Sequence, residues 1–570
     1  MTTIPPVSKS TGHLTLAAMA LAVSWWLPNH HWPWADFYSD AWASIVLGLV
    51  AAAVLWRHRG EGLLGWHLLP LVVLGCLLAV GIQHAAGLIE ASGVAWISAL
   101  YLLALFIALL SGGAWERSRP GQCAQFLFVA VLIGAMGSLL IQLQQWLGVD
   151  VGDAFWLFLP APAGRFHANI GQPNQLASLM CLGVLACAWL YEQQRLPGKA
   201  AWILAALLAI GLALTESRTS WVVISCATAV ILFWRKRLGV KWVFVSAAFC
   251  WVVIFVLCVF ALPHVNILLG RPPQEVRGLM GGEIRLDIWV GVLDSLKHQP
   301  WFGYGWMQTS LTQFPADPYQ VPTYGSLRHA HNLFLDLLVF MGIPIGLAIC
   351  TVLVFWFVVA LLRLRTRDQL WMLLFVLALG IHGMLEFPLY YAYFLLPLGL
   401  IVGALNVSLG FKVLFRTPHW PLFVMLGAAF LGCFITARDY LPIEKSFFAL
   451  RFEHQKLAKP DENASPSPLV LSHLEDLLWL GRVDPVSEHS EADIARAIRV
   501  SKLTPSLVGQ FKLASMYALA NQPHEAEYWL IVMLRSNGVK PRAADELRAQ
   551  WQALAVTYTS MAQVTWPKFN

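Results

Sequence analysis

Thirteen apolar runs, separated by short polar segments, follow one another along the first 436 residues. They lie at 14–28, 41–56, 64–83, 94–112, 123–147, 175–191, 200–215, 219–234, 241–262, 343–362, 369–385, 388–407 and 420–436. Most hold the roughly 17–25 residues with which a helix crosses the hydrocarbon core of a bilayer. In lipid a helix satisfies all of its backbone polar groups internally. The pattern therefore predicts an all-α polytopic membrane protein of about 13 transmembrane helices.

Composition supports this prediction. Of the 570 residues, 58% are hydrophobic and only 12% are charged, and the mean hydropathy is +0.62. A soluble globular protein averages roughly 25% charged residues. The net charge of +6 does not indicate a nucleic-acid partner, because the basic residues fall in short loops between spans.

Loop charge predicts which way the helices run. The basic residues gather in every second loop: Arg57/Arg59, Arg117/Arg119, Arg195/Lys199, Arg235/Lys236/Arg237/Lys241, Arg363/Arg365/Arg367 and Lys412/Arg416. Loops 29–40 and 84–93 have no Lys or Arg. By the positive-inside rule the basic loops are cytoplasmic. The outer side then receives loops 148–174 and 263–330, the turns at 216–218 and 386–387, and the C-terminal tail.

Three further features complete the predicted organisation. The first run follows a nearly uncharged segment and shows no convincing cleavage site, so we interpret it as a retained helix. Residues 331–362 are too long for one straight span, and Gly342-Ile343-Pro344 offers a break between a short interfacial helix, 331–341, and the span. The predicted domains are 1–160 with the N-terminal transmembrane helices, 161–436 as the core, and 437–570 as an outer helical domain.

The last of these domains is mostly polar. A Pro/Ser-rich break at 459–468 precedes amphipathic patterns at 491–502, 508–520, 524–536 and 541–556. The spacing of Phe511, Ala514 and Tyr517, followed by Glu525 to Leu530, is typical of a tetratricopeptide-like helical hairpin. We therefore expect a small soluble α-helical domain.

No cysteine or histidine pattern indicates a metal site or a disulfide framework. All nine cysteines lie inside or beside apolar runs, without ligand spacing: Cys76, Cys123, Cys181, Cys187, Cys226, Cys250, Cys258, Cys350 and Cys433. Gly-rich phosphate loops and paired aspartates for a metal-bound nucleotide are also missing from the sequence. We expect neither metal nor cofactor.

Arginines on the outer side are exceptions to the positive-inside rule. Arg218 lies in the tight turn 215–220, Arg285 in loop 263–330 and Arg165 at the end of loop 148–174. A guanidinium offers a planar fork of donors that suits phosphate oxygens and stays charged at any relevant pH. The alternative for each is contact with lipid headgroups, which is strongest for Arg165.

Amides and tyrosines gather on the same side. Gln172, Asn174 and Gln175 precede a span, and side-chain amides both donate to and accept from sugar hydroxyls. The alternative is capping of the next helix by Asn174. Tyr391 belongs to an outer cluster that could equally form an aromatic belt, whereas Glu386 at a membrane boundary should have a polar partner.

The stretch Arg328-His329-Ala330-His331-Asn332 closes the longest polar loop and leads directly into an apolar run. Histidine has the side chain best suited to moving a proton near neutral pH. The alternative is a polar cluster that only wets the membrane interface at a helix start.

These motifs together resemble the O-antigen ligase and polymerase superfamily. The resemblance rests on Gln172-Pro173-Asn174, Ser217-Arg218-Thr219, Arg285 with Trp289 leading to 298–305, His331-Asn332, and Glu386-Phe387-Pro388-Leu389 with the tyrosines that follow. It covers roughly 160–450 and is greatest to the branch of pilin-glycosylation O-oligosaccharyltransferases. The first five spans resemble nothing beyond generic membrane helices.

The resemblance implies a GT-C-like glycosyltransferase of the bacterial inner membrane whose active site faces the periplasm. Its donor is a glycan on undecaprenyl pyrophosphate, and its acceptor is Ser or Thr of a protein such as a pilin. His331 then takes the acceptor proton, while Arg218 and Arg285 neutralise the leaving pyrophosphate. Gln172, Asn174, Gln175, Tyr391, Glu386, Arg165 and Asn332 line the substrates. His329, which does not fit the motif, is expected only to wet the interface.

Three alternatives remain. An O-antigen ligase would use the same chemistry on a lipid A-core sugar, and an O-antigen polymerase would join repeat units. A lipid or glycan transporter would carry charged or interrupted helices near the bilayer midplane, whereas the polar clusters here gather on one side.

The charge alternation makes a topology prediction. With the N-terminus inside and thirteen spans, a reporter that is active only in the periplasm should be active when it is fused after residue 440. A silent but well-expressed fusion would remove one span and place the tail in the cytoplasm.

Overall fold

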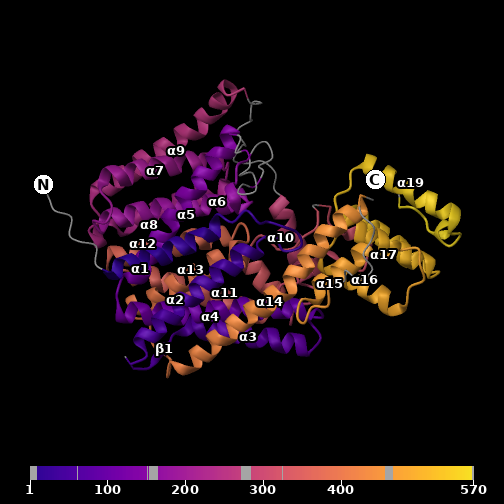
Figure 1. Cartoon of the computed structure of the whole chain (residues 1–570), viewed down its shortest axis with the longest axis horizontal. Helices are drawn as coiled ribbons and strands as arrows, with labels where there is room; N and C mark the ends of the chain where they lie inside the picture. Colours follow the sequence, from indigo (N-terminus) through magenta and orange to yellow (C-terminus); the bar gives the residue numbers. More distant parts are fainter. Residues whose placement is uncertain are drawn as a thin grey trace. The chain divides into compact units, whose positions relative to one another are not determined.

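The computed structural model describes residues 9–60, 62–149, 152, 159, 165–270, 284–323, 325–455, 457 and 466–567. Most of these residues are in helices, and the strands are two short segments (Figure 1). The chain divides into two compact units. Unit 1 takes residues 1–76, 101–281 and 352–431, and unit 2 takes 77–100, 282–351 and 432–570.

Thirteen helices coincide with the thirteen predicted runs. They are α1 (Lys9–Ala22), α2 (Phe37–His58), α3 (Leu68–Ala85), α4 (Ser92–Ser118), α5 (Gln122–Leu147), α6 (Pro173–Glu192), α7 (Gly198–Leu214), α8 (Arg218–Leu238), α9 (Trp242–Leu268), α11 (Leu333–Leu362), α12 (Arg367–Gly383), α13 (Ala392–Ser408) and α14 (Trp420–His454). Among the described residues, eight of these are long and apolar enough to cross a membrane, and three more segments are shorter apolar helices. The prediction of an all-α polytopic membrane protein is confirmed.

Two details differ from the sequence-based boundaries. Residues 64–66 are not helical: β1 (Leu64–Trp66) pairs antiparallel with β2 (Phe415–Thr417), with Gly65 opposite Arg416. Helix α14 continues to His454, so one helix crosses the boundary expected at residue 436. Most of the Pro/Ser-rich break at 459–468 lies outside the described residues. The break at Gly342 is confirmed, since its φ of 74° and ψ of 169° interrupt α11.

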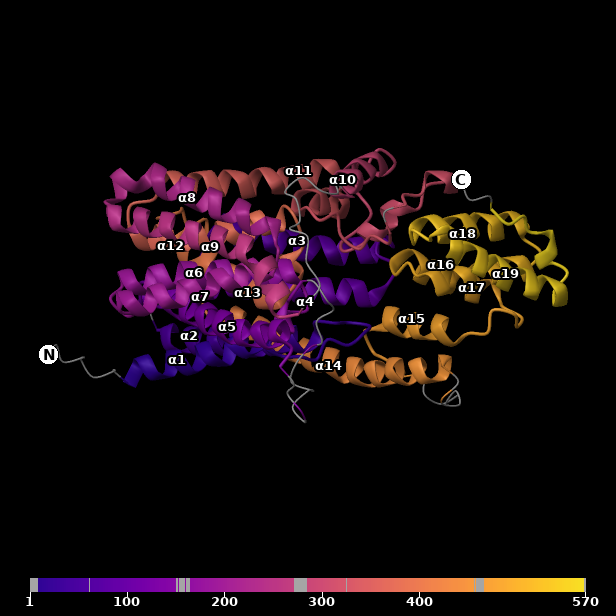
Figure 2. The same ribbon diagram turned by 90° about the horizontal axis from the view of Figure 1, so that it is seen from above.

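Close helix packing builds the core of unit 1. Figures 1 and 2 show α1, α5, α6 and α7 side by side, and Phe126, Leu127 and Leu179 are fully buried among them. Helices α4 and α13 meet at glycines: a Cβ atom on Gly112 would lie 2.0 Å from the carbonyl oxygen of Leu400. Small residues of this kind let helix backbones approach closely in membranes.

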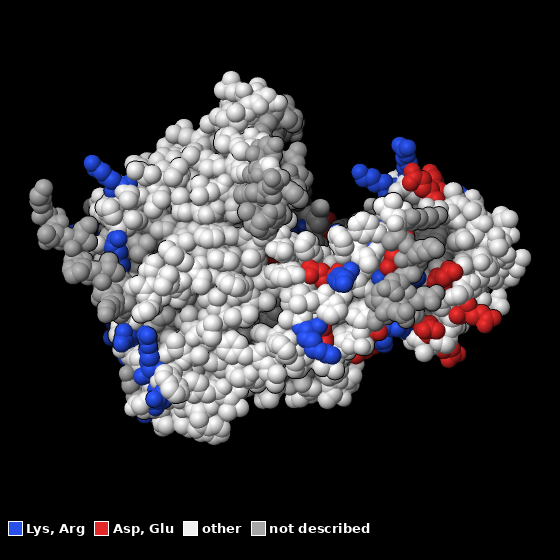
Figure 3. Space-filling model, in the orientation of Figure 1, with Lys and Arg blue, Asp and Glu red and all other residues white. Residues whose placement is uncertain are grey.

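The two ends of these helices differ in charge. Helices α2, α6 and α8 run toward Arg59, Arg195 and Arg237, whereas α12 starts at Arg367 and runs the other way. Figure 3 shows Lys and Arg side chains of unit 1 along one edge. The opposite helix ends carry the polar segments 29–40, 165–175, 215–218 and 386–391. Every motif of unit 1 that the sequence singled out therefore belongs to the same end of the bundle.

Unit 2 contains the C-terminal helices. Helix α10 (Ile284–Ser295) and the short helices η4 (Thr309–Gln313) and η5 (Pro318–Gln320) precede α11. The C-terminal helices are α15 (Ser472–Arg482), α16 (Glu491–Leu503), α17 (Leu507–Leu519), α18 (Pro523–Ser536) and α19 (Pro541–Thr557). Helices α17 and α18 form the expected hairpin around Leu513, Leu530 and Trp529.

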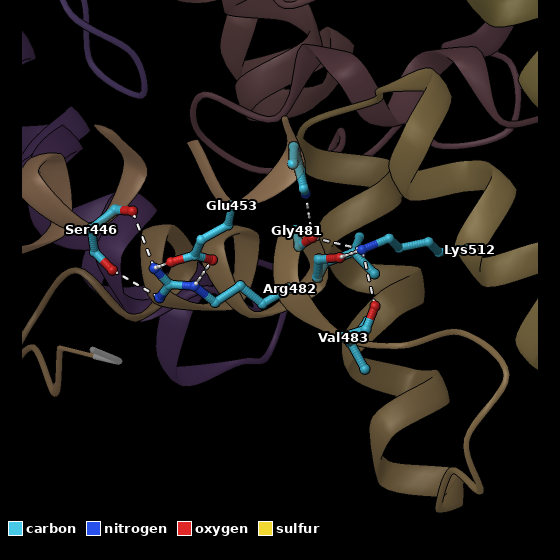
Figure 4. Close-up of polar contacts among 8 residues, drawn as sticks. Ser446, Glu453, Gly481, Arg482, Val483 and Lys512 are labelled. Carbon is cyan, nitrogen blue, oxygen red and sulfur yellow. Dashed lines mark hydrogen bonds and ion pairs between the residues drawn. The ribbon is translucent and has the colours of Figure 1, made fainter. Parts of the chain in front are cut away.

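Side chains join α14, α15 and α17 (Figure 4). Arg482 donates to both carboxylate oxygens of Glu453 at 2.9 Å and to the hydroxyl of Ser446 at 2.8 Å. Lys512 donates to the carbonyls of Leu480, Gly481 and Val483 at 2.6–3.1 Å. These carbonyls end α15 and would otherwise lack helical partners. Burial lowers the pKa of Lys512 to about 8. The three bonds of this lysine hold α17 against the end of α15.

Candidate functional site

The side chain of Asn174 joins three of the sequence motifs in unit 1. Its amide nitrogen donates to Oε1 of Glu386 at 2.9 Å. Its Oδ1 accepts from the guanidinium of Arg165 at 3.0 Å and from the hydroxyl of Ser217 at 2.9 Å. The three partners come from stretches 9 to 212 residues away. Hydrogen bonds to charged partners contribute about 1.5–3 kcal/mol each, so Asn174 holds these loops in register.

Helix starts position this side chain. Pro173 occupies the first turn of α6, and Oε1 of Gln172 accepts from the backbone N–H of Gln175 at 2.8 Å. Gln172 is therefore the N-cap, and the alternative that Asn174 caps this helix is wrong. With the cap supplied by Gln172, the amide of Asn174 is available for Glu386. Proline suits the first helical position because its missing N–H would have had no helical partner.

Arg165 also bonds inward. Its Nε donates to the carbonyl of Thr215 at 3.0 Å. Together with the bond to Asn174, this ties loop 165–175 to the turn between α7 and α8. The guanidinium is only partly exposed, so Arg165 supports the turn that carries Arg218.

A second branch starts at Gln175. Its Oε1 accepts from the hydroxyl of Tyr393 at 2.8 Å, and the same hydroxyl lies 3.2 Å from Oδ1 of Asp36. Nδ1 of His30 lies 3.5 Å from that carboxylate. Burial raises the pKa of Asp36 to about 7, against the lowering effect of Tyr393. Burial also lowers the pKa of His30, so burial favours the neutral form of both members of the pair.

Tyr391 and Asp40 complete this branch. The ring of Tyr391 stacks on Tyr393 with centroids 5.3 Å apart. Oδ1 of Asp40 accepts from the backbone N–H of Ala392, and its Oδ2 accepts from the hydroxyl of Tyr101, both at 2.6 Å. Asp40 is 4% exposed. A carboxylate so deeply buried needs such donors, and it fixes the start of α13 beside Tyr391.

Arg218 begins α8 directly after a strained turn. Glu216 has a φ of 49°, which is unusual for a residue other than glycine. Ser217 is the N-cap of α8 but makes no side-chain cap bond, because its hydroxyl donates to Asn174. The first N–H groups of the helix, its dipole and the guanidinium of Arg218 together make this helix end positive. Such an end suits a phosphate.

An apolar cavity of about 220 Å³ lies between α6, α7, α8 and α9, with Trp371 of α12 at its wall. Leu185, Trp202, Ile231 and Val252 are among its lining residues. Along α8 the lining begins five residues beyond Arg218, which is roughly 8 Å at 1.5 Å per residue. The lining is almost entirely apolar, as contact with a hydrocarbon chain would require.

In unit 2, His331 stands in a left-handed backbone conformation with a φ of 52°. Before it, the carbonyl of Ala330 accepts from the indole N–H of Trp289 at 3.0 Å. After it, Oδ1 of Asn332 accepts from the backbone N–H groups of Phe334 and Leu335. Asn332 thus starts α11 and is not simply a substrate-facing amide. Strained residues of this kind persist only where their surroundings hold them, often at functional sites.

His329 differs from its neighbour. Its ring Nδ1 is buried while the residue as a whole is partly exposed, and the expectation that His329 only wets the interface stays a prediction. Burial, together with His331 and Arg328, lowers the pKa of His329 to about 3. A base so weak contributes little to proton abstraction near neutral pH, which leaves His331 as the candidate of this stretch.

Arg285 belongs to the first turn of α10. It precedes Trp289 by four residues, so the two side chains share one face of the helix. Because Trp289 bonds Ala330, this face of α10 is the one next to the histidine segment. Residues 271–283 of the same predicted loop lie outside the described residues.

Sequence reasoning missed Asp36 and Asp40, and it named Ser217 and Tyr393 only as members of motifs, without a role of their own. Asp36 and Asp40 are four residues apart at the outer boundary of a predicted span, in a loop without Lys or Arg. An acidic side chain at a membrane boundary needs a polar partner, which is the same signal that singled out Glu386. Across the described part of the chain, His, Cys, Asp and Glu form no group of three or more that could hold a metal ion.

Two family descriptions match parts of the chain. Residues 203–350, which include Arg218, Arg285 and His331, match the family described as O-antigen ligase. Residues 370–546, which include Glu386 and Tyr391, match the one described as virulence factor membrane-bound polymerase, C-terminal.

Two relatives from Acinetobacter baylyi extend the match. The general O-oligosaccharyltransferase is 28% identical over 563 residues, which cover 92% of this chain and 94% of that protein. The ComP-specific O-oligosaccharyltransferase is 27% identical over 354 residues, which cover 61% of this chain and 64% of that protein. These similarities support an O-oligosaccharyltransferase or ligase role for a multi-pass membrane enzyme of the glycosyltransferase type. The resemblance that the motifs predicted is thereby confirmed: the chain is similar to the family described as O-antigen ligase over residues 203–350 and to O-oligosaccharyltransferases over most of its length.

Proposed function

We propose that this protein transfers an oligosaccharide en bloc from undecaprenyl pyrophosphate to a Ser or Thr hydroxyl of a periplasmic protein such as a pilin. The observation that carries the proposal is the hydrogen bonding of Asn174 to Arg165, Ser217 and Glu386. It draws together, at one end of unit 1, three of the motifs on which the family resemblance rests: Gln172-Pro173-Asn174, Ser217-Arg218-Thr219 and the stretch that begins at Glu386. A glycan-binding site needs fixed amides and carboxylates at a membrane boundary, and this network supplies them.

The donor is the first part of the proposal. Arg218, at the positive start of α8, and Arg285, in the first turn of α10, neutralise the pyrophosphate as it leaves. Charge on the leaving group grows in the transition state, so preorganised cations lower the barrier. The apolar cavity between α6, α7, α8 and α9 is consistent with a donor that carries a lipid. Two of the helices that line it also carry Asn174 and Arg218. The arginines do the work that a metal would do elsewhere, so transfer needs neither metal nor nucleotide.

The chemical step is a single displacement. The acceptor oxygen attacks the anomeric carbon, the bond from that carbon to the pyrophosphate oxygen breaks, and His331 takes the hydroxyl proton. Undecaprenyl pyrophosphate leaves with the electron pair of the broken bond. Gln172, Gln175 and Tyr391 contact the glycan or the acceptor, and Asn174, Glu386, Arg165 and Asn332 hold the loops around them.

A second candidate is ligation of the same donor to a lipid A-core sugar. The match of residues 203–350 to the family described as O-antigen ligase favours it. Both relatives with O-oligosaccharyltransferase names favour a protein acceptor.

Mass spectrometry of periplasmic proteins and lipopolysaccharide, with and without this gene, separates the two candidates. We expect a glycan to disappear from a pilin or another exported protein in the deletion strain. Loss from lipopolysaccharide alone would select the ligase instead. Adding back a His331→Ala copy should not restore the glycan, whereas a wild-type copy should.

Turnover of histidine variants tests the general base. His331→Ala should lower turnover roughly 10²–10⁴-fold, the usual range for acid–base catalysis, with little change in donor binding. Arg218→Ala and Arg285→Ala should lower turnover and also weaken donor binding, since a phosphate-binding cation acts on ground and transition states alike.

His329→Gln is the matched control, because it keeps a buried polar side chain beside the strained residue. It should retain most of the turnover if His331 is the base. Equal losses from the two histidine variants, each shown to be folded, would refute the assignment and leave the arginines as the main catalytic groups.

A further inference from the structure

Helix α18 forms two hydrogen bonds with the loop that leads to His331. The hydroxyl of Tyr528 donates to the carbonyl of Pro315 at 3.1 Å, and Nε of Arg535 donates to the carbonyl of Val321 at 2.8 Å. Tyr528 and Arg535 are seven residues apart, so they project from one face of the helix. Two backbone carbonyls of the loop are thereby bound to the C-terminal domain.

Apolar contacts reinforce these bonds. The ring of Phe314 lies 6.0 Å from that of Trp529, centroid to centroid. Val321 is fully buried within the hydrophobic core of the C-terminal helices. A loop residue that is part of another domain's core cannot shift without opening that core. Residues 314–321 therefore move with α18.

Gln313 connects the loop held by α18 to the segment that precedes the histidines. Its side chain is fully buried. Its Nε2 donates to the carbonyl of Gly325 at 2.8 Å, and its Oε1 accepts from the backbone N–H of Leu327 at 2.6 Å. One amide thus fixes the backbone on both sides of residue 326, and it stands next to Phe314 in the sequence.

Asp336 of α11 fixes the other end of the segment. It is 1% exposed, and its Oδ1 accepts from the hydroxyl of Thr309 at 2.8 Å and from the backbone N–H of Ala330 at 3.0 Å. The short helix η4 is thereby tied at Thr309 to the residue before His331 and at Gln313 to residues 325–327. Because Phe314 directly follows η4, a shift of the α18-bound loop displaces η4 and both ties.

We propose that α18 is a positioning element for the transfer reaction: Tyr528 and Arg535, by holding residues 315–321, set the direction in which the strained His331 presents its imidazole. This rests on the proposed role of His331 as the base. Misplacing a reacting group by about 1 Å can cost about a hundredfold in rate. The C-terminal helical domain then contributes to catalysis, because it positions the segment that carries His331.

The test uses the full-length purified protein and two measurements, hydrogen exchange of backbone amides 325–335 and steady-state transfer kinetics. Arg535→Ala should accelerate exchange in 325–331 and lower kcat about tenfold, with the KM for the lipid-linked donor changed less than about twofold. Arg535→Lys, which keeps a donor, should recover most of both effects, and Tyr528→Phe should show a smaller loss. Arg542→Ala is the matched control, because that arginine lies on α19 with its side chain 95% exposed.

A double variant separates positioning from general damage. His331→Ala with Arg535→Ala should be no slower than His331→Ala alone, because α18 acts through the histidine. Losses that multiply would overturn the proposal, as would unchanged exchange in 325–331 or exchange accelerated throughout the C-terminal helices. Full turnover of the His331→Ala variant alone would refute both the assignment of His331 as the base and the positioning role of α18. This result needs no α18 variant, so failure of the proposed function can be told apart from failure of the α18 proposal.

Discussion

The buried side chain of Asn174 is the interaction on which the candidate site depends. At the end of a membrane helix, polar groups that leave water must find partners inside the protein, or their burial is costly. Asn174 satisfies a carboxylate, a guanidinium and a hydroxyl at once. Asn174 lies in the first turn of α6, Ser217 directly precedes α8 and Glu386 follows α12, so one amide links the ends of three helices. Removing its bonds would free the turn in which Arg218 begins α8.

Strain at two positions is consistent with this arrangement. Glu216 and His331 are both left-handed residues other than glycine, and each stands beside a residue proposed for catalysis or is one. Such conformations cost of order 1–3 kcal/mol and require surroundings that over-determine them. Around His331 those surroundings include Trp289, Asp336 and Asn332. The polar network of unit 1 and the hydrogen bonds of unit 2 thus each restrain a residue for which a catalytic role is proposed, Arg218 in unit 1 and His331 in unit 2.

The spans could be predicted because apolar runs are local and lengthy, and each of the thirteen runs became a helix. The ends were less predictable. Residues 437–454 are too polar to continue a hydrophobic run, yet α14 extends through them, held at its far end by the bond from Arg482 to Glu453. The strand Leu64–Trp66 forms only because Phe415–Thr417, about 350 residues later, pairs with it. Partners that distant leave no local signal.

The sequence indicated many of the residues of the candidate site, but it did not indicate which of them contact one another. Positive-inside asymmetry singled out Arg165, Arg218 and Arg285, and the need of Glu386 for a partner was correct. That Asp36 and Asp40 join the cluster through Ala392 and Tyr393 depends on contacts across 352 and 357 residues. Asn174 is not the cap of α6 but bonds Glu386, 212 residues away, which the local sequence does not indicate. The role of α18 is equally invisible in the sequence, since Tyr528 and Arg535 bind backbone carbonyls that any residue would supply.

The central claim is a direct displacement of lipid pyrophosphate by a protein hydroxyl, with His331 as base and without a covalent glycosyl-enzyme. The anomeric configuration of the product tests it most directly. Purified protein, a lipid-linked oligosaccharide of known anomeric configuration and a Ser-containing acceptor should yield a glycopeptide whose linkage can be assigned by NMR. The account predicts inversion at the anomeric carbon. Retention would require a double displacement through a glycosyl-enzyme and would contradict it.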